Sequence, residues 1–109
     1  MERMGMVIGI APEHIDEYRR LHAAVWPSVL SRLAASHIRN YSIFLREPEN
    51  LLFGCWEYHG NDYAADMAAI AEDPETRRWW ALCGPCQRPL DSRGEGEHWA
   101  PMEQVFHAD

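Results

Sequence analysis

Cysteine is scarce in this sequence of 109 residues. The three cysteines are Cys55, Cys83 and Cys86. So small and odd a number does not form the disulfide framework of a small secreted domain, and it indicates a reducing compartment. The first residues also lack the apolar segment of a secretory signal peptide. We therefore expect a cytoplasmic protein.

Positive charge and long apolar runs are scarce as well. Ten basic residues stand against seventeen acidic ones, which gives a net charge of −7. This balance argues against nucleic acid or an anionic membrane as a partner. No apolar run approaches the roughly 20 residues that a membrane-spanning helix needs. The length fits one domain over residues 1–109, built around one hydrophobic core.

Aromatic residues, in contrast, are plentiful, with five tryptophans, four tyrosines and three phenylalanines. Tyr18, His22 and Trp26 recur at every fourth position, so on a helix they share one face. A histidine between aromatic rings can be part of a core. It can also present to a pocket the one side chain whose ordinary pKa lies near neutrality. This spacing alone leaves both interpretations open.

The hydrophobic pattern predicts strands and helices in a definite order. We expect a strand over 4–11, a helix over 12–36 interrupted at Pro27, strands over 40–46 and 51–58, helices over 62–72 and 76–82, a long loop over 84–101 and a last strand over 102–107. Asp73 and Pro74 are expected to be the N-cap and first residue of the last helix. Gly5 and Gly9 lie on one face of the first strand, where they leave room for another segment to approach.

This β-α-β-β-α-β order predicts a ferredoxin-like α+β fold, with a four-stranded antiparallel sheet and helices on one face. The other face of such a sheet needs cover. A second copy stacked sheet to sheet supplies it, so we expect a homodimer in the form of a dimeric α/β barrel.

The tetrapeptide Cys83-Gly-Pro-Cys86 matches the redox motif of thioredoxin-like proteins. In those proteins the first cysteine opens a helix after a strand, and the helix N-terminus lowers its pKa. Here the motif follows a predicted helix, so we interpret Gly84 as a helix C-cap. A zinc site that adds Cys55 and His59 would contain only one Cys-x-x-Cys pair, which is weak evidence for metal. We expect neither a metal nor a cofactor.

The remaining candidates are a histidine and several aromatic rings. Aromatic faces together with hydroxyl hydrogen-bonding groups suit a sugar, which has C–H faces and O–H edges. The same side chains would also suit an aromatic core, and composition does not decide between the two. The residues concerned are Tyr18, His22, Trp26, Tyr41, Trp79 and Trp80.

Four segments, in their order and spacing, resemble the L-rhamnose mutarotase family: Tyr18-x-x-x-His22-x-x-x-Trp26-Pro27, Asn40-Tyr41-Ser-Ile with Asn50-Leu-Leu-Phe53, Trp79-Trp80, and Glu103-Gln-Val-Phe106. The likeness covers residues 4–86 and 102–107. It implies a metal-free, dimeric, ferredoxin-like enzyme that interconverts the α and β anomers of a 6-deoxy-L-hexose, a monosaccharide. It also implies that His22 is the proton donor and that Tyr18, Tyr41, Trp79 and Trp80 contact the sugar.

The segment after Trp79-Trp80 departs from the family pattern. It reads Cys83-Gly-Pro-Cys-Gln-Arg-Pro-Leu90 and continues as a long loop through His98-Trp99, in place of an Asn-Pro-Asp-Asn-Ser-Pro type of segment. Members similar to this variant are associated with L-fucose. The resemblance therefore leaves L-rhamnose and L-fucose both open as the substrate.

Mutarotation moves protons between oxygen atoms, so we expect a second acid/base group to face His22. Glu57, Glu103 and His107 are candidates that the sequence does not rank. Two other functions remain open. One is a non-catalytic or oxidative dimeric barrel that binds a small aromatic or haem-like ligand, and the other is a thiol–disulfide enzyme.

Overall fold

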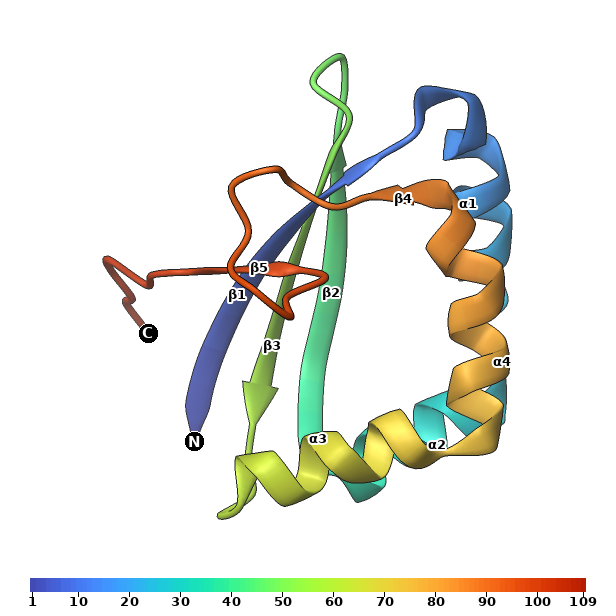
Figure 1. Ribbon diagram of the computed structural model, residues 1–109. Coiled ribbons are helices and arrows are strands. Elements are labelled where there is room, and N and C mark those ends of the chain that lie inside the picture. Colours follow the sequence, from blue (N-terminus) through green and yellow to red (C-terminus); the bar gives the residue numbers. More distant parts are fainter.

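The computed structural model describes all 109 residues, and an antiparallel sheet is its frame (Figure 1). Its order is β2-β3-β1-β4, with β5 also paired to β1. The long strands are β1 (Glu2–Ile10), β2 (Ile38–Arg46) and β3 (Leu51–Tyr58), and the short ones are β4 (Gln87–Arg88) and β5 (Ala100–Met102). The predicted α+β class and the antiparallel sheet are confirmed.

The four helices lie on one side of the strands (Figure 1). None of them is both long and apolar enough to cross a lipid bilayer. They are α1 (Ile15–His22), α2 (Pro27–Ala35), α3 (Tyr63–Glu72) and α4 (Pro74–Cys83), with short 3-10 turns η1 (Pro12–His14) before α1 and η2 (Gly84–Cys86) after α4.

The helical segment predicted over 12–36 with an interruption at Pro27 is two helices, with a turn of four residues between them over 23–26. α1 ends at His22, and Pro27 opens α2, where the missing N–H of proline would have no intrahelical partner anyway. Trp26 is extended and lies outside both helices. It nevertheless stays near His22, because both rings contact Trp79.

Local capping separates the last two helices as predicted. The carboxylate of Asp73 accepts hydrogen bonds from the backbone N–H and the hydroxyl of Thr76, at 2.9 and 2.8 Å. Pro74 follows as the first residue of α4. The N-cap satisfies backbone donors that a helix leaves without intrahelical partners.

A β-bulge in β2 determines which of its side chains face the helices. One extra residue lies between Arg39 and Ser42, and Asn40 has a positive φ of 50°. Strict alternation would place Ile38 and Ile43 on opposite faces of the sheet. The extra residue brings both to the helix side, where each packs against a buried cluster.

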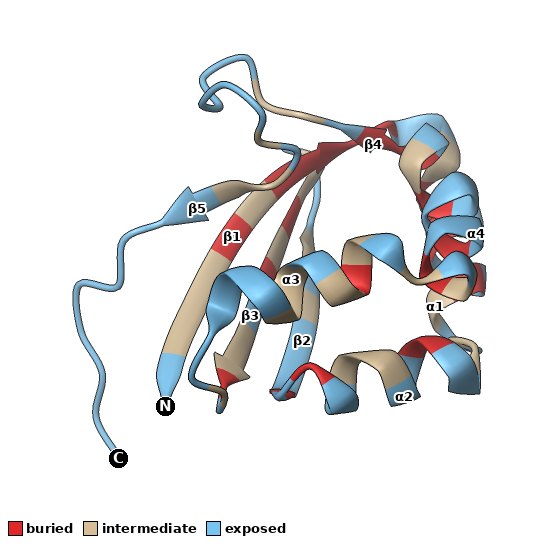
Figure 2. Cartoon of the chain, turned by 60° about the horizontal axis from the view of Figure 1, so that its bottom comes forward, coloured by how far each residue is buried: buried red, intermediate tan, exposed pale blue.

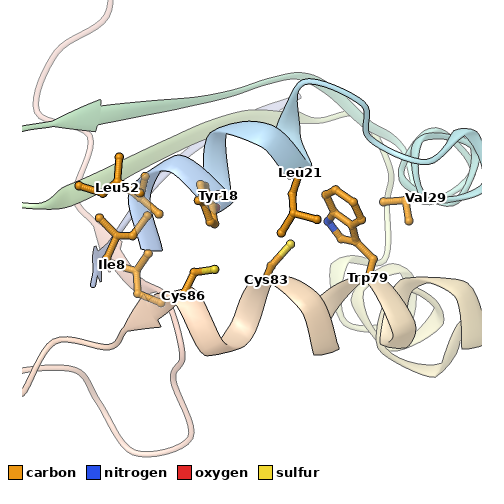
Figure 3. Close-up of a cluster of buried hydrophobic side chains, with 10 residues drawn as sticks. Ile8, Tyr18, Leu21, Val29, Leu52, Trp79, Cys83 and Cys86 are labelled. Carbon is orange, nitrogen blue, oxygen red and sulfur yellow. The ribbon is translucent and has the colours of Figure 1, made fainter. Parts of the chain in front are cut away.

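The main core fills the space between the helices and the sheet, and the buried residues in Figure 2 lie along these inner surfaces. The opposite, open face of the sheet carries exposed apolar side chains such as Phe44, which is 62% exposed. The core members, most of them labelled in Figure 3, are Ile8, Ile10, Ile15, Tyr18, Leu21, Val29, Leu52, Trp79, Cys83 and Cys86.

The strand predicted over 102–107 is wrong. β5 ends at Met102, and residues 103–109 form an irregular, exposed tail that runs away from the helices (Figure 1). Pro101 lies inside β5 and has no N–H to donate, which weakens pairing at this edge. An apolar alternation therefore did not suffice to continue the strand.

The fourth strand is interrupted rather than displaced. Arg88 of β4 pairs with Gly9 of β1, and Ala100 of β5 pairs with Val7. Only Ile8 separates the two pairs on β1, so residues 89–99 leave the sheet and return to the same edge. The predicted long loop therefore connects two short strands, β4 and β5, that pair with the same edge of β1.

The two glycines of β1 lie where this edge strand comes close. A Cβ on Gly9 would meet the backbone oxygen of Arg88 at 2.5 Å, and one on Gly5 would meet the methyl group of Met102 at 3.2 Å. The prediction that both leave room for a neighbouring segment is confirmed.

Candidate active site

α1 places Tyr18 and His22 one turn apart with their rings stacked. The ring centroids are 4.1 Å apart and the planes differ by 23°. Trp79 of α4 meets His22 edge-on at 5.3 Å and meets Trp26 edge-on at 5.4 Å. Residues from two helices and the turn after α1 thus form one continuous aromatic group. The helical spacing predicted the pairing of Tyr18 with His22, whereas Trp26 joins the group from outside the helix, through Trp79.

The protonation pattern of His22 follows from its own helix. Its Nδ1 lies 2.9 Å from the backbone oxygen of Tyr18. A carbonyl oxygen only accepts, so Nδ1 carries the hydrogen and Nε2 of the neutral ring has the free lone pair. Burial lowers the pKa of His22 below its ordinary value of 6.5, while the bond to Tyr18 acts in the opposite direction. The neutral ring with an unprotonated Nε2 is therefore favoured at pH 7.

A small cavity lies between α1 and the sheet. Its volume is about 150 Å³. This is below the roughly 300–1,000 Å³ of sites for drug-sized ligands, so it suits one small molecule. Its lining is mainly apolar. The side chains of Tyr18, Arg19 and His22 supply its polar groups. The lining residues are Ile10, Ile15, Tyr18, Arg19, His22, Ile43, Leu45 and Leu52.

Two phenol groups add hydrogen-bond donors. Burial raises the pKa of Tyr18, an effect that the side chain of Gln87 opposes and the hydroxyl of Tyr41 reinforces. Tyr41 is 36% exposed over the whole residue, but burial around its hydroxyl, helped by the nearby Cys83 thiol, raises its pKa to about 12. Both phenols therefore keep their protons at neutral pH.

The adjacent tryptophans Trp79 and Trp80 point to different sides of α4. Trp79 is 6% exposed and belongs to the core, whereas Trp80 is 48% exposed. Successive residues point about 100° apart around an α-helix, because it has 3.6 residues per turn. The structure brings Trp79, and not Trp80, to the stack of Tyr18 and His22.

The structure brings none of the three candidates for the second acid/base group to His22. Glu57 alternates onto the open face of the sheet, where it accepts hydrogen bonds from Asn40 and Arg3 and contacts His59. Bonding to His59 and then to Asn40 lowers the pKa of Glu57 to about 2. The other two candidates, Glu103 and His107, lie in the exposed terminal tail.

Sequence reasoning missed the residues that the edge strand contributes. Nε2 of His98 lies 2.7 Å from Oε1 of the buried Gln87. Trp99 packs against the main core and lies over Gly54, where a Cβ would be 3.5 Å from its ring. The surrounding Gly- and Pro-rich loop has no periodicity that could have indicated these contacts. Trp56, which meets Tyr41 edge-on at 4.9 Å, could have been found from the alternation along β3.

The cysteines are not arranged for redox or zinc chemistry. Cys83 and Cys86 are buried beside Tyr18 at the C-terminal end of α4, as Figure 3 shows, and Cys55 lies exposed on the sheet. Burial raises the pKa of Cys83 to about 12, opposite to the shift that activates a redox thiol. No three His, Cys, Asp or Glu side chains are grouped so that they could hold a metal ion.

Known proteins similar to this chain point to one family. The family model described as L-rhamnose mutarotase matches residues 3–108. The chain belongs to the L-rhamnose mutarotase family. An L-rhamnose mutarotase of Oceanobacillus iheyensis is 29% identical over 109 residues, which are all of both chains. One of Yersinia pestis is 39% identical over 80 residues, 73% of this chain and 74% of the relative.

Solved structures share the fold. The crystal structure of an L-rhamnose mutarotase from Formosa agariphila superposes with a TM-score of 0.78 at 21% identity, over all of both chains. Tetracenomycin F2 cyclase of Streptomyces glaucescens, a type-II polyketide cyclase, superposes with a TM-score of 0.70 at 15% identity, also over both full chains. At such low identity these likenesses show the fold alone, and they confirm its ferredoxin-like class.

The family match also covers the segment that departs from the family pattern. Residues 84–101 lie inside the matched range of 3–108. The Cys83-to-Leu90 variant and the excursion after it are therefore a variation within the L-rhamnose mutarotase family.

Proposed function

We propose that this protein is a mutarotase that interconverts the α and β anomers of a 6-deoxy-L-hexose, with His22 as the general acid/base. The observation that carries the proposal is the His22 imidazole in a small cavity, with Nδ1 held by the Tyr18 carbonyl and Nε2 free. The names of the relatives support L-rhamnose as the sugar. L-fucose is the alternative to test beside it.

The chemistry requires only proton transfer. Nε2 of His22 takes the proton of the anomeric hydroxyl, the bond between C1 and the ring oxygen breaks, and the ring oxygen gains a proton as the C1 carbonyl forms. After rotation about the C1–C2 bond, the freed hydroxyl attacks the other face of C1 and the protons return. Positioned proton transfer of this kind contributes about 10²–10⁴ in rate.

The surrounding groups bind and orient the sugar. The protonated phenols of Tyr18 and Tyr41 donate hydrogen bonds to sugar oxygens, and the apolar lining and Trp79 exclude water from the reacting atoms. We assign no sugar contact to Trp80, because it is exposed outside the aromatic stack. The proton for the ring oxygen comes from water or from a donor other than Glu57, Glu103 and His107.

NMR exchange spectroscopy of the anomeric protons tests this proposal. Equilibrated L-rhamnose and L-fucose are measured separately, each with and without protein. We expect faster exchange between the α and β signals of L-rhamnose, and the L-fucose sample reports the specificity. Unchanged exchange for both sugars would contradict the proposal, and a Soret band after addition of haem would support the ligand-binding alternative.

We also propose a homodimer that covers the open face of the sheet. Phe44 is 62% exposed there and lies opposite the half-buried Phe53, which pairs with Val7 on the next strand. Contiguous exposed apolar groups of this kind mark association surfaces. Sedimentation velocity at micromolar concentration is expected to show a dimer, and a monomer there would contradict the stacked-sheet arrangement.

We place the protein in the cytoplasm. All three cysteines are free thiols, which agrees with a reducing compartment. Fractionation of cells that express the full-length protein checks this assignment.

A further inference from the structure

The excursion of residues 89–99 returns a histidine to the edge of the candidate site. His98 lies directly before β5, and its Nε2 is 2.7 Å from Oε1 of Gln87 in β4. Gln87 is buried and pairs with Ile10, which lines the cavity together with Tyr18, and its side chain opposes the rise of the Tyr18 pKa. The exposed His98 is therefore hydrogen-bonded to a buried amide that lies beside the cavity which the Tyr18 phenol lines.

The chemistry of these groups gives the chain a direction. The amide oxygen of Gln87 only accepts, so Nε2 of His98 is the donor. The NH₂ group of Gln87 is then the end that is left to donate, and the phenol oxygen of Tyr18 is the acceptor that suits it. With the phenol oxygen accepting on this side, the hydroxyl proton of Tyr18 would be free to point into the cavity.

We propose that His98 is a positioning residue for the sugar site, which holds the amide of Gln87 so that the Tyr18 proton is donated to the substrate. This inference rests on the proposed mutarotase function. Without His98, the Gln87 amide can turn and present its oxygen to Tyr18. The phenol would then donate to Gln87, and the sugar would lose a hydrogen bond.

A double-mutant cycle tests this inference. His98→Ala is expected to raise KM for the sugar by about 3- to 10-fold, the range of one hydrogen bond, with a smaller change in kcat. In the Tyr18→Phe background the same substitution is expected to have no further effect, because the hydroxyl through which it acts is absent. His98→Gln retains an N–H donor and is expected to restore most of the wild-type KM.

The control is Glu95→Ala, an exposed substitution in the same excursion, which is expected to match the wild type. If His98→Ala raises KM equally with and without the Tyr18 hydroxyl, His98 does not act through Tyr18 and the inference is wrong. If His98→Gln gives no rescue, the N–H donor is not what matters, and the inference fails as well.

A second measurement separates this inference from the proposed function. In protein labelled with ¹³C at tyrosine Cζ, His98→Ala is expected to shift the Tyr18 resonance while Glu95→Ala leaves it in place. A wild-type protein without exchange activity would contradict the mutarotase proposal, yet the shift would still report the coupling. An unmoved Tyr18 resonance in an active protein would overturn the inference alone.

Discussion

The two faces of the sheet place titratable groups in opposite environments. On the helix side, burial lowers the pKa of His22 and leaves its Nε2 unprotonated near neutral pH. On the open face, Glu57 contacts His59, Asn40 and Arg3, and these partners lower its pKa to about 2. A carboxylate held in this way stays ionised and is a poor proton donor at pH 7. The sheet therefore separates a buried, neutral histidine on the helix side from an ionised carboxylate on the open face.

The largest expected effect compares the buried side of the helix layer with its exposed side, through the two neighbouring tryptophans of α4. Trp79→Ala removes a buried ring and is expected to cost about 3–5 kcal/mol of unfolding free energy. Trp80→Ala, at an exposed position, is expected to stay within about 0.5 kcal/mol of the wild type. Urea denaturation at one protein concentration measures both. Equal losses would mean that Trp80 is covered, for example by a second copy of the chain.

Loss of the His22 imidazole should remove the acid/base group that we propose on the helix side of the sheet. His22→Ala is expected to slow anomer exchange per folded molecule by at least ~10²-fold, the lower end of general acid/base catalysis. NMR exchange and a melting curve on the same preparation separate catalysis from folding. A melting temperature that falls while the exchange rate stays within about threefold of the wild type would make His22 a core residue only.

The matched control for this variant is His14→Ala. His14 lies just before α1 and its side chain makes no capping hydrogen bond. Its exchange rate is expected to equal that of the wild type.

A charge on the open face tests the role of that face in association. Phe44→Asp is expected to raise the dimer dissociation constant at least ~10-fold, because a charged group would be buried between two sheets. Leu30→Asp, at an exposed apolar position on α2, serves as the control and is expected to leave the dimer intact. Sedimentation velocity over a concentration series measures both, and equal weakening would locate the interface elsewhere.

The smallest expected effect is a displacement of the pH profile. The folded-state pKa of His22 is lowered from 6.5, so exchange should rise with pH and reach half its maximum below 6.5. In that window the unfolded chain binds more protons than the folded one. The contribution of His22 to stability is therefore complete above about 6.5 and declines as pH falls towards the folded pKa. NMR titration of His22 checks the direction, and a midpoint above 6.5 would contradict it.

Local signals in the sequence predicted much of the architecture. Pro27 marked the start of α2, Asp73-Pro74 marked the start of α4, and the order of strands and helices was correct up to residue 86. These signals are reliable because capping and missing N–H groups act within one helical turn. The strand predicted over 102–107 failed, since β-propensity is a weak, context-dependent signal and the chain leaves the edge of β1 after Met102.

The candidate site was predictable in part for the same reason. Tyr18 and His22 meet because they are four residues apart on one helix, and that spacing is visible in the sequence. The position of Trp80 outside the stack and the return of His98 to Gln87 were not visible. They depend on how α4 is rotated against the core and on an excursion that closes across a strand edge.

The sequence by itself determined the element order, the helix boundaries at proline and aspartate, and the aromatic–histidine face of α1. Only the tertiary structure decided which face of the sheet each side chain occupies, because one extra residue at Asn40 reverses the alternation along β2. It also decided that the interrupted fourth strand brings His98 within hydrogen-bonding distance of the buried Gln87. Register and long-range closure depend on contacts between distant segments, and no local periodicity encodes them.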